Sequence, residues 1–402
     1  MKKFAKLSLV ASLALSSSVF ADSLEEAFKA SKVSGEIRSE YSSSNFLGQS
    51  ESDSIFAVGG SLGVVTGSYY GFKLGATFQT SHVVDLSNDS GVFGDSPLSN
   101  DALDVQGSVL SESYLQYTIS NTTLKAGRQY IYTPLVSTGL DGKSSQSLIK
   151  DSFEAYLLTN TDIPDTTVIA GYVSKYQAKR DANGDVGNFE SFEDGAYTLY
   201  VKNTSIKNLT IQAQYFDLDG KTAAADKDAL YFQADYKIGT HTISAQYLKS
   251  TDKSQANEDG QAYGLMSSGA LGIGKLGYLV SFNQTSDDGP VYTGAGTGTS
   301  DTLFTAMPVN GGGVPARADT TTLVGGVVIP VAGVTLIPYV GQSSRDIGLG
   351  DVVAMGAIAI YPYGKHFLLK ANYEHVNLEN TVPGLIPDEN TDVVRLYLSY
   401  KF

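Results

Sequence analysis

Apolar and polar residues alternate along almost the whole chain from Val33 onward, in segments of about eight to eleven residues. Residues 72–79, 229–238 and 393–402 are clear examples, because the apolar side chains in them recur at every second position. This period is typical of a strand with one face buried. Eighteen such segments are predicted, and they start near Val33, Phe56, Phe72, Val109, Thr122, Ser152, Thr167, Gly195, Leu209, Ala229, Thr242, Ala262, Leu276, Thr321, Val334, Val353, Phe367 and Val393.

The connections between these segments alternate between short and long. Short turns are predicted at 120–121, 239–241, 330–333 and 362–366, and the connections between them are much longer polar loops. Regular alternation of this kind indicates consecutive antiparallel hairpins whose long loops all lie at one end. The predicted fold class is therefore all-β, a single up-and-down antiparallel barrel of 18 strands.

One stretch of the chain permits a different structure. Residues 320–344 carry no charge over 25 residues, which is long enough for a membrane-spanning helix. However, Pro330 and Pro338 would break a helix, and valine, isoleucine and threonine dominate the segment. We therefore predict two strands around the turn at 330–333.

The two faces of the predicted strands differ in charge. On the face with the apolar parity, Arg128 is the one charged residue that we assign. The opposite face carries Glu36, Arg38, Glu40, Lys73, Glu112, Lys125, Glu154, Lys175, Lys202, Asp235, Lys237, Lys370, Glu374, Arg395 and Lys401. Charges facing a dry core are costly, so a soluble sandwich does not fit this pattern. A transmembrane barrel does, because lipid contacts the apolar face and a wide lumen keeps the charged face in water.

Aromatic residues support this interpretation. They gather at predicted strand ends, where an interfacial girdle requires them, at Tyr41, Tyr117, Tyr215, Tyr247, Tyr361, Phe367, Tyr373, Tyr400 and Phe402.

Arg128 departs from the charge pattern. It shares parity with Leu124 and Ala126 but follows Gly127, and a bulge at that glycine would turn the arginine toward the lumen. Alternatively, Arg128 ends a strand at the level of the lipid headgroups, where a charge costs little.

The first 21 residues have the features of a secretory signal peptide. A basic start with three lysines precedes an apolar run over residues 7–15, and Val19-Phe20-Ala21 resembles a cleavage site. A membrane anchor is the alternative, but the apolar run is short and interrupted by serines. Residues 22–32 are predicted to form a short amphipathic helix in the periplasm, and residues 33–402 the barrel.

Composition excludes several classes of protein. The chain has 402 residues and no cysteine, which excludes a disulfide scaffold, a cysteine zinc site and a cysteine nucleophile. A net charge of -14 argues against nucleic-acid binding. Charged residues make up only 17% of the chain, below the roughly 25% of soluble domains, as a lipid-facing surface would require.

The long connections are acidic. They hold most of the 42 aspartates and glutamates but a minority of the 28 lysines and arginines, which predicts a mouth that attracts cations. Acidic loops also serve solubility alone, so this inference rests on the summed excess. The third long loop, residues 133–151, contains Asp141, Lys143, Lys150 and Asp151, and we predict that it folds inward as a constriction.

Signals for catalysis and metal binding are weak. Residues 59–63 fit the G-x-S-x-G pattern around Ser61, but they lie inside an alternating strand with no helix after it. Asp181, Asn183 and Asp185 match the first three ligands of a calcium loop, whereas Val186 stands where that loop needs glycine. We expect no cofactor, and calcium binding at these three residues is kept as a hypothesis beside a solvated acidic loop.

Several segments resemble a known family. Residues 23–28 (SLEEAF), 33–38 (VSGEIR), 123–129 (TLKAGRQ), 152–155 (SFEA) and 159–167 (TNTDIPDTT) resemble OprD-type outer-membrane porins, particularly those of Campylobacter-like bacteria. The resemblance is dense over residues 23–175 and only architectural beyond, apart from a terminal Phe402 that resembles the signal read by the outer-membrane assembly machinery.

The resemblance implies an 18-stranded channel in the bacterial outer membrane that passes ions and small polar nutrients, with the third loop as constriction and a basic ladder on the wall. Arg128 and Lys125 would belong to that ladder, and Glu154 would follow the constriction loop. The pore-lining and constriction candidates are Arg38, Lys73, Glu112, Lys125, Arg128, Asp141, Lys143, Lys150, Asp151, Glu154, Lys202, Lys237, Lys370 and Arg395. Residues 147–150 (SLIK) depart from the family pattern, so its solute preference does not transfer.

The expected partners are outer-membrane lipid, ions and small polar solutes, the assembly machinery, and two further copies of the chain if it forms a homotrimer. A mild cation preference is expected from the acidic mouth. The alternatives are an outer-membrane barrel hydrolase and a surface barrel whose loops serve adhesion.

Overall fold

The computed structural model describes residues 22–45, 53–84, 105–139, 147–220, 226–252, 258–308, 313–345, 350–378 and 389–402. The predicted signal peptide, Asp141 and Lys143 lie outside these residues. The described residues form an 18-stranded antiparallel sheet, one short α-helix and one 3-10 helix. The strands are β1 (Lys32–Asn45), β2 (Asp53–Val65), β3 (Phe72–Val83), β4 (Gly107–Ile119), β5 (Thr122–Gln129), β6 (Ser152–Asn160), β7 (Thr166–Gln177), β8 (Phe189–Asn203), β9 (Leu209–Leu218), β10 (Lys227–Ile238), β11 (His241–Asp252), β12 (Glu258–Ala270), β13 (Gly277–Thr285), β14 (Thr320–Val331), β15 (Val334–Arg345), β16 (Val352–Tyr363), β17 (Phe367–Leu378) and β18 (Glu389–Lys401).

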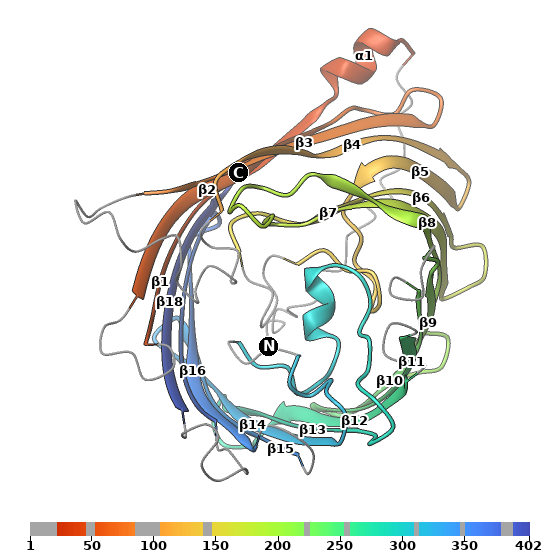
Figure 1. Cartoon of the computed structure of the whole chain (residues 1–402). Helices are drawn as coiled ribbons and strands as arrows, with labels where there is room; N and C mark the ends of the chain where they lie inside the picture. The colour runs from red at the N-terminus through yellow and green to blue at the C-terminus, as the bar shows by residue number, and fades with distance from the viewer. Residues whose placement is uncertain are drawn as a thin grey trace.

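The sheet is closed. Each strand pairs with its neighbours in the chain, and β1 pairs with β18, so the strands form the ring seen in Figure 1. At the seam, Gly35 and Phe402 exchange two backbone hydrogen bonds of 3.0 Å. A Cβ at Gly35 would lie 2.7 Å from the Ser61 carbonyl oxygen and 2.4 Å from the Phe402 ring, so this position needs glycine. The closed all-β barrel of 18 strands confirms the predicted fold.

Residues 320–344 form the predicted hairpin. β14 and β15 pair across the turn at 332–333, where Ala332 and Gly333 both have positive φ. Among the residues that the structure describes, no helix is long and apolar enough to cross a membrane.

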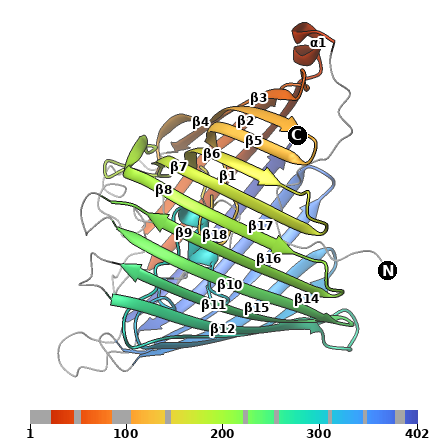
Figure 2. The ribbon, with the colours of Figure 1, turned by 90° about the vertical axis from the view of Figure 1, so that its right-hand side faces the viewer.

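The predicted N-terminal helix is shorter than residues 22–32. Helix α1 spans Leu24–Lys29, because the Ser23 Oγ caps it by accepting the Glu26 N–H at 3.1 Å, and β1 already begins at Lys32. The helix lies outside the ring, at the end with the short turns (Figure 2). There the Ala27 carbonyl accepts the Gly67 N–H at 2.9 Å, which attaches α1 to the turn between β2 and β3.

Large apolar side chains cover the outside of the barrel. Examples are Leu62, Phe78, Leu265, Met355 and Leu396, which are all about half exposed. Aromatic rings form contacts at both ends of the wall, with Phe367 and Tyr400 near the short turns (4.7 Å) and Tyr247 and Tyr263 near the long loops (5.1 Å). An apolar band between two aromatic girdles is the surface that a bilayer requires.

Two long loops fold into the barrel. The described parts of the third long loop (residues 133–139 and 147–151) and of the seventh long loop (residues 286–308 and 313–319), which contains the 3-10 helix η3 (Thr297–Asp301), lie inside the ring in Figure 1. The inward fold of the third loop agrees with the prediction, whereas the seventh loop was not expected there.

Candidate functional site: the constricted lumen

The third and seventh long loops are joined to each other inside the lumen. Val136 pairs with Ala295 in a parallel bridge, in which the Ala295 N–H donates to the Leu135 carbonyl at 2.9 Å. The Thr302 hydroxyl adds a hydrogen bond of 2.8 Å to the Pro134 carbonyl. The two inward loops therefore form one unit.

Asp151 connects this unit to the wall. Its Oδ1 accepts the Gly139 N–H and the Thr297 hydroxyl, each at 2.8 Å, and its Oδ2 accepts the Thr297 N–H at 2.7 Å and the Tyr176 hydroxyl at 3.1 Å. The side chain is fully buried. Asp151 was predicted as a constriction charge, but its carboxylate is used to hold the two loops and β7 together.

One half of the barrel, β6–β12, packs against the two loops. Its inward apolar side chains form the largest apolar cluster of the described residues with loop residues such as Leu135 and Leu303. The wall contributes Phe153, Ala155, Val173, Ala196, Phe216, Ala229, Tyr231, Leu248 and Ala262. We call β6–β12 the packed half. This apolar packing narrows the expected water-filled interior on the side of β6–β12.

Three amide side chains of the wall accept hydrogen bonds from backbone N–H groups of the loops. Gln214 Oε1 accepts the Leu135 N–H at 2.8 Å, and Gln246 Oε1 accepts the Phe304 N–H at 2.9 Å. Asn283 Oδ1 accepts the Thr305 N–H at 3.1 Å. These residues are not among the candidates predicted from the sequence. The signal for them would have been uncharged amides beside apolar residues at inward-facing positions.

The other half of the barrel, β1–β5 and β14–β18, carries most of the inward charges, and we call it the charged half. Arg38 Nη1 donates to the Ser147 carbonyl of the third loop at 2.8 Å, and Arg395 Nη1 donates to the Pro308 carbonyl of the seventh loop at 3.2 Å. Each inward loop is thus held at its far side by an arginine of the charged half. Both arginines were predicted to line the pore, and both are only 4% exposed.

Glu112 and Lys125 form an ion pair inside the lumen. The Lys125 ammonium lies 3.5 Å from Glu112 Oε1 and 3.7 Å from the centre of the Tyr114 ring. Glu112 Oε2 also accepts the Thr77 hydroxyl at 2.7 Å. The structure therefore brings together two of the predicted pore-lining residues from β4 and β5.

The remaining predicted lysines are spread around the wall. Lys150 is fixed through its backbone, which exchanges hydrogen bonds of 2.9 and 3.0 Å with Gln79, and its ammonium lies 4.9 Å from the Tyr130 ring centre. Lys370 lies 5.6 Å from the ring centre of Tyr397. Lys73 on β3, Lys202 on β8 and Lys237 on β10 are at inward-facing positions close to the short turns.

Lys179 is a buried cation that is not among the candidates predicted from the sequence. It follows β7, is 4% exposed, and its environment includes the charges of Asp151, Glu40, Asp301 and Arg38. Burial lowers the pKa of Lys179 to about 8, although the three acids oppose this shift. Its only sequence signal was a basic residue just beyond the end of a strand.

The structure corrects the placement of Arg128 and Glu154. Glu154 lies between the buried, inward Phe153 and Ala155, and it shares parity with the exposed Tyr156. Arg128 is in register with Glu154, so both point outward. Phe153 and Ala155 are apolar because they pack against the loops, and apolarity therefore does not identify the lipid face on this strand.

Lys175 also points outward, against its predicted parity. Ser174 is an extra residue in β7 at a register shift opposite Glu154 and Ala155, which places Lys175 across from Glu154. Arg128 remains outward although Gly127 before it has φ +118. Of the two interpretations of Arg128, the strand-end position is the one that the register supports.

Asp181, Asn183 and Asp185 lie together in the loop after β7. Asp181 Oδ1 accepts the backbone N–H groups of Asn183 at 2.8 Å and Asp185 at 3.0 Å, so the loop uses this carboxylate for its own turn. The described residues contain no cluster of three or more histidine, cysteine, aspartate or glutamate side chains that could hold a metal ion. Calcium binding by these three residues stays a prediction.

Two recesses flank the third loop in the lumen. One, of about 310 Å³, is lined on the charged half by Ser34, Gly35, Glu36, Ser61, Gly63, Thr77, Glu112, Tyr130, Lys150, Lys401 and Phe402. The other, of about 290 Å³, lies between both loops and β10 and is lined by Tyr132, Thr133, Pro134, Ser137, Tyr231, Gln233, Gly298, Asp301 and Thr302. Acidic, basic and hydroxyl groups meet in the first recess, which suits small polar solutes.

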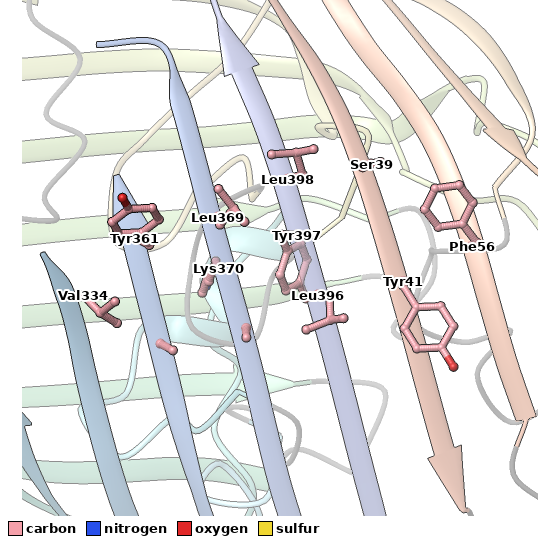
Figure 3. Close-up of a pocket in the computed structure, with 12 residues that line it drawn as sticks. Ser39, Tyr41, Phe56, Val334, Tyr361, Leu369, Lys370, Leu396, Tyr397 and Leu398 are labelled. Carbon is pink, nitrogen blue, oxygen red and sulfur yellow. The ribbon is translucent and has the colours of Figure 1, made fainter. Parts of the chain in front are cut away.

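A larger hollow of about 460 Å³ involves β1, β2 and β15–β18. Figure 3 shows Tyr41, Phe56, Tyr361, Leu369 and Leu396 around it. The small residues Ser39, Ala359 and Ala371 also line it. Leu369 and Leu396 are nearly half exposed on the outward face, so this hollow belongs to the lipid-facing side and not to the pore.

Comparison with known proteins agrees with this geometry. The structure of OccK3 (OpdO) from Pseudomonas aeruginosa matches with a TM-score of 0.70 at 16% identity, over 94% of this chain and 97% of that chain. OccAB1 from Acinetobacter baumannii matches with a TM-score of 0.74 at 13% identity, over 94% and 98% of the two chains. At such low identity these matches show the fold alone. No curated protein sequence matches the chain significantly.

The family relationship comes from the sequence profile described as Campylobacter major outer membrane protein, which matches residues 1–210. This is more than half of the 402 residues, and it includes the segments that carried the resemblance to OprD-type porins. The chain belongs to the Campylobacter major outer membrane protein family and is a porin of the bacterial outer membrane.

Proposed function

We propose that solutes pass this porin along the charged half, as ions and small polar molecules that diffuse passively with a mild preference for cations. The observation that carries the route is the contrast within the lumen. The packed half buries apolar loop residues such as Leu135 and Leu303, and Asp301 is the one charged residue that lines its recess. The recess on the charged half is lined by Glu36, Glu112, Lys150 and hydroxyl groups.

The preference for cations is supported by the acidic long connections. Their excess of aspartate and glutamate accounts for the net charge of -14, and such a rim attracts cations within a Debye length of about 8 Å at physiological salt. The basic residues Lys125, Lys370 and Arg395 on the wall act in the opposite direction, so the preference is mild.

Planar-bilayer recording tests this proposal. The purified protein is expected to give discrete conductance steps, and its reversal potential in a potassium chloride gradient should have the sign of cation selectivity. Anion selectivity would contradict the proposal and would mean that the wall charges dominate the mouth. Absence of conductance steps would contradict the route through the lumen.

We propose no chemical step for this chain. Ser61, the serine of the G-x-S-x-G pattern, lies inside β2, where it pairs with Glu36 of β1 and Gln79 of β3. A nucleophile elbow requires a sharp strand-to-helix turn, which this position lacks. Esterase activity that disappears in Ser61→Ala would support the alternative of a barrel hydrolase, and cell binding lost on shortening the loops would support an adhesin.

Two partner proposals follow from the ends and the outside of the barrel. Phe402 is 50% exposed at the β1–β18 seam, where the assembly machinery could read it, and Phe402→Ala is expected to lower the yield of assembled protein in cells. A homotrimer would need an apolar contact face, and the hollow of Figure 3 offers one. Light scattering in detergent distinguishes a trimer from a monomer.

A further inference from the structure

Three charged side chains face outward together near the long-loop end of β5, β6 and β7. Arg128 Nε lies 3.8 Å from Glu154 Oε2, and the Lys175 ammonium lies 3.3 Å from Glu154 Oε1. Their side chains are 35%, 27% and 36% exposed, in the order Arg128, Glu154 and Lys175. We call these residues the outer triad, and its formal charge is one positive unit.

The outer triad lies just beyond an aromatic belt. Tyr156, Tyr172 and Tyr197 are neighbours on the outward face, with ring centres 6.4 and 5.2 Å apart. Such belts mark the boundary between hydrocarbon and headgroups. Glu154 precedes Tyr156 by two residues on the same face, toward the long loops. The triad is therefore at headgroup level, where charges are hydrated.

Arg128 is held in place before any ligand binds. Its guanidinium carbon lies 4.1 Å from the centre of the Phe189 ring, and its Nη1 donates to the Leu110 carbonyl at 3.4 Å. A guanidinium that is already ordered loses less conformational entropy when it binds, and its planar fork matches phosphate oxygens. Lys175 supplies a second cation on the other side of Glu154.

Other outward charges at this end of the barrel do not combine two cations. Lys249 pairs one-to-one with Asp259 at 3.4 Å, and Asp217 faces Asp228 across the β9–β10 ladder. Along the strands that the structure describes, the outer triad is the one place where two basic side chains share the outward face.

We propose that the outer triad binds a phosphate of an anionic glycolipid headgroup in the outer leaflet. Arg128 and Lys175 contact the phosphate oxygens, and the carboxylate of Glu154 limits the net positive charge of the site. The site is on the outside of the wall, so it does not depend on the route of solutes through the lumen. A lipid bound there would fix the barrel against its surrounding leaflet.

The test compares lipid binding by two variants of the purified porin in detergent. The neutral triple variant Arg128→Gln, Glu154→Gln, Lys175→Gln leaves no unpaired charge, and Lys249→Gln is the matched control. The probe is lipid A with two phosphates, measured by native mass spectrometry. The triple variant should bind it at least about tenfold more weakly, about 1.4 kcal/mol, whereas the control should bind it normally. The conductance of both variants should be unchanged.

Three further arms separate the alternatives. The affinity of the wild-type protein for dephosphorylated lipid A should be no higher than the affinity of the triple variant for intact lipid A. Equal affinity of the wild-type protein for the two lipids would overturn the proposal. Inorganic phosphate that binds as tightly as the lipid would overturn it in favour of a free-anion site. A change of oligomeric state in the triple variant, with lipid affinity unchanged, would overturn it in favour of contact with a second copy.

A single substitution gives an opposite prediction. Glu154→Gln removes the carboxylate that competes with phosphate but keeps both cations, so lipid A should bind more tightly. Weaker binding by Glu154→Gln would contradict the proposal. The proposal would also be contradicted if Glu154→Gln and the triple variant both bound lipid A with the affinity of the wild-type protein.

Discussion

The packed half and the charged half are built from the same alternating strands but face different surroundings. Inward residues on β6–β12 include Phe216 and Leu248, which are fully buried against the loops. Inward residues on β17 and β18 include Lys370, Glu374 and Arg395. In this barrel, the inward-facing residues of the strands are therefore not polar throughout. They are mainly apolar where the loops pack against β6–β12, and they include charged side chains on the charged half, where Arg38 and Arg395 bind loop carbonyls.

The loops are attached differently to the two halves. On the packed half and the adjoining β13 they bury apolar surface, and their backbone N–H groups donate hydrogen bonds to the amide oxygens of Gln214, Gln246 and Asn283. On the charged half, Arg38 and Arg395 bind loop carbonyls, and smaller apolar clusters around Ile149 and Met307 complete the contact. Apolar burial on the packed half should therefore contribute most of the free energy that holds the two loops against the wall.

The largest expected effect comes from the centre of the packed half. Leu135→Ala should destabilise the protein by about 2–5 kcal/mol, because Leu135 is fully buried between the loops and the wall. Loosening the loop unit should also raise the single-channel conductance. Chemical unfolding in vesicles and bilayer recording measure the two effects.

Leu265→Ala is the matched control for Leu135→Ala. Leu265 is 57% exposed on the outward face of β12, so its truncation should leave conductance unchanged and cost much less stability. If Leu135→Ala behaves like Leu265→Ala, the loops do not pack as described.

A smaller effect is expected from the link between the two loops. Asp151→Asn replaces one acceptor oxygen by a donor, facing Gly139, Thr297 and Tyr176, and should cost about 1–3 kcal/mol. The loop unit should then fluctuate more, and channel noise should increase. Asp287→Asn removes the same charge from an exposed position in the seventh loop and should change neither property.

The period-two pattern was sufficient to predict the strands, because lipid contact imposes it on every strand. It predicted 18 strands and the hairpin at 320–344, and the closed sheet confirms them. It could not place Lys175, because the extra residue Ser174 shifts the parity of β7 without a mark in the pattern.

The lumen was harder to predict. Phe153 and Ala155 appear lipid-facing in the sequence because apolar residues that contact loops and apolar residues that contact lipid have the same hydropathy. The seventh long loop is rich in glycine and threonine, so nothing in its sequence shows that it folds inward. Asp151 and Lys179 appeared as exposed loop charges because their partners come from distant segments.

The smallest effect is expected from pH. Because the pKa of Lys179 is lowered to about 8, this side chain loses its proton as the pH rises from 7 to 9, and the interior loses one positive charge. The cation preference should therefore increase over this range, as a shift in reversal potential. Lys179→Arg keeps the charge and should abolish the shift. An unchanged shift in that variant would assign it to another group.

The central claim is that water and solutes follow the charged half and not the packed half. The chain has no cysteine, so single cysteines can be introduced at Lys370 and at Leu248 and treated with a small charged thiol reagent during bilayer recording. Lys370→Cys should react rapidly and lower the current, whereas Leu248→Cys, at a fully buried position, should not react. Equal reaction and equal block at the two positions would contradict the account.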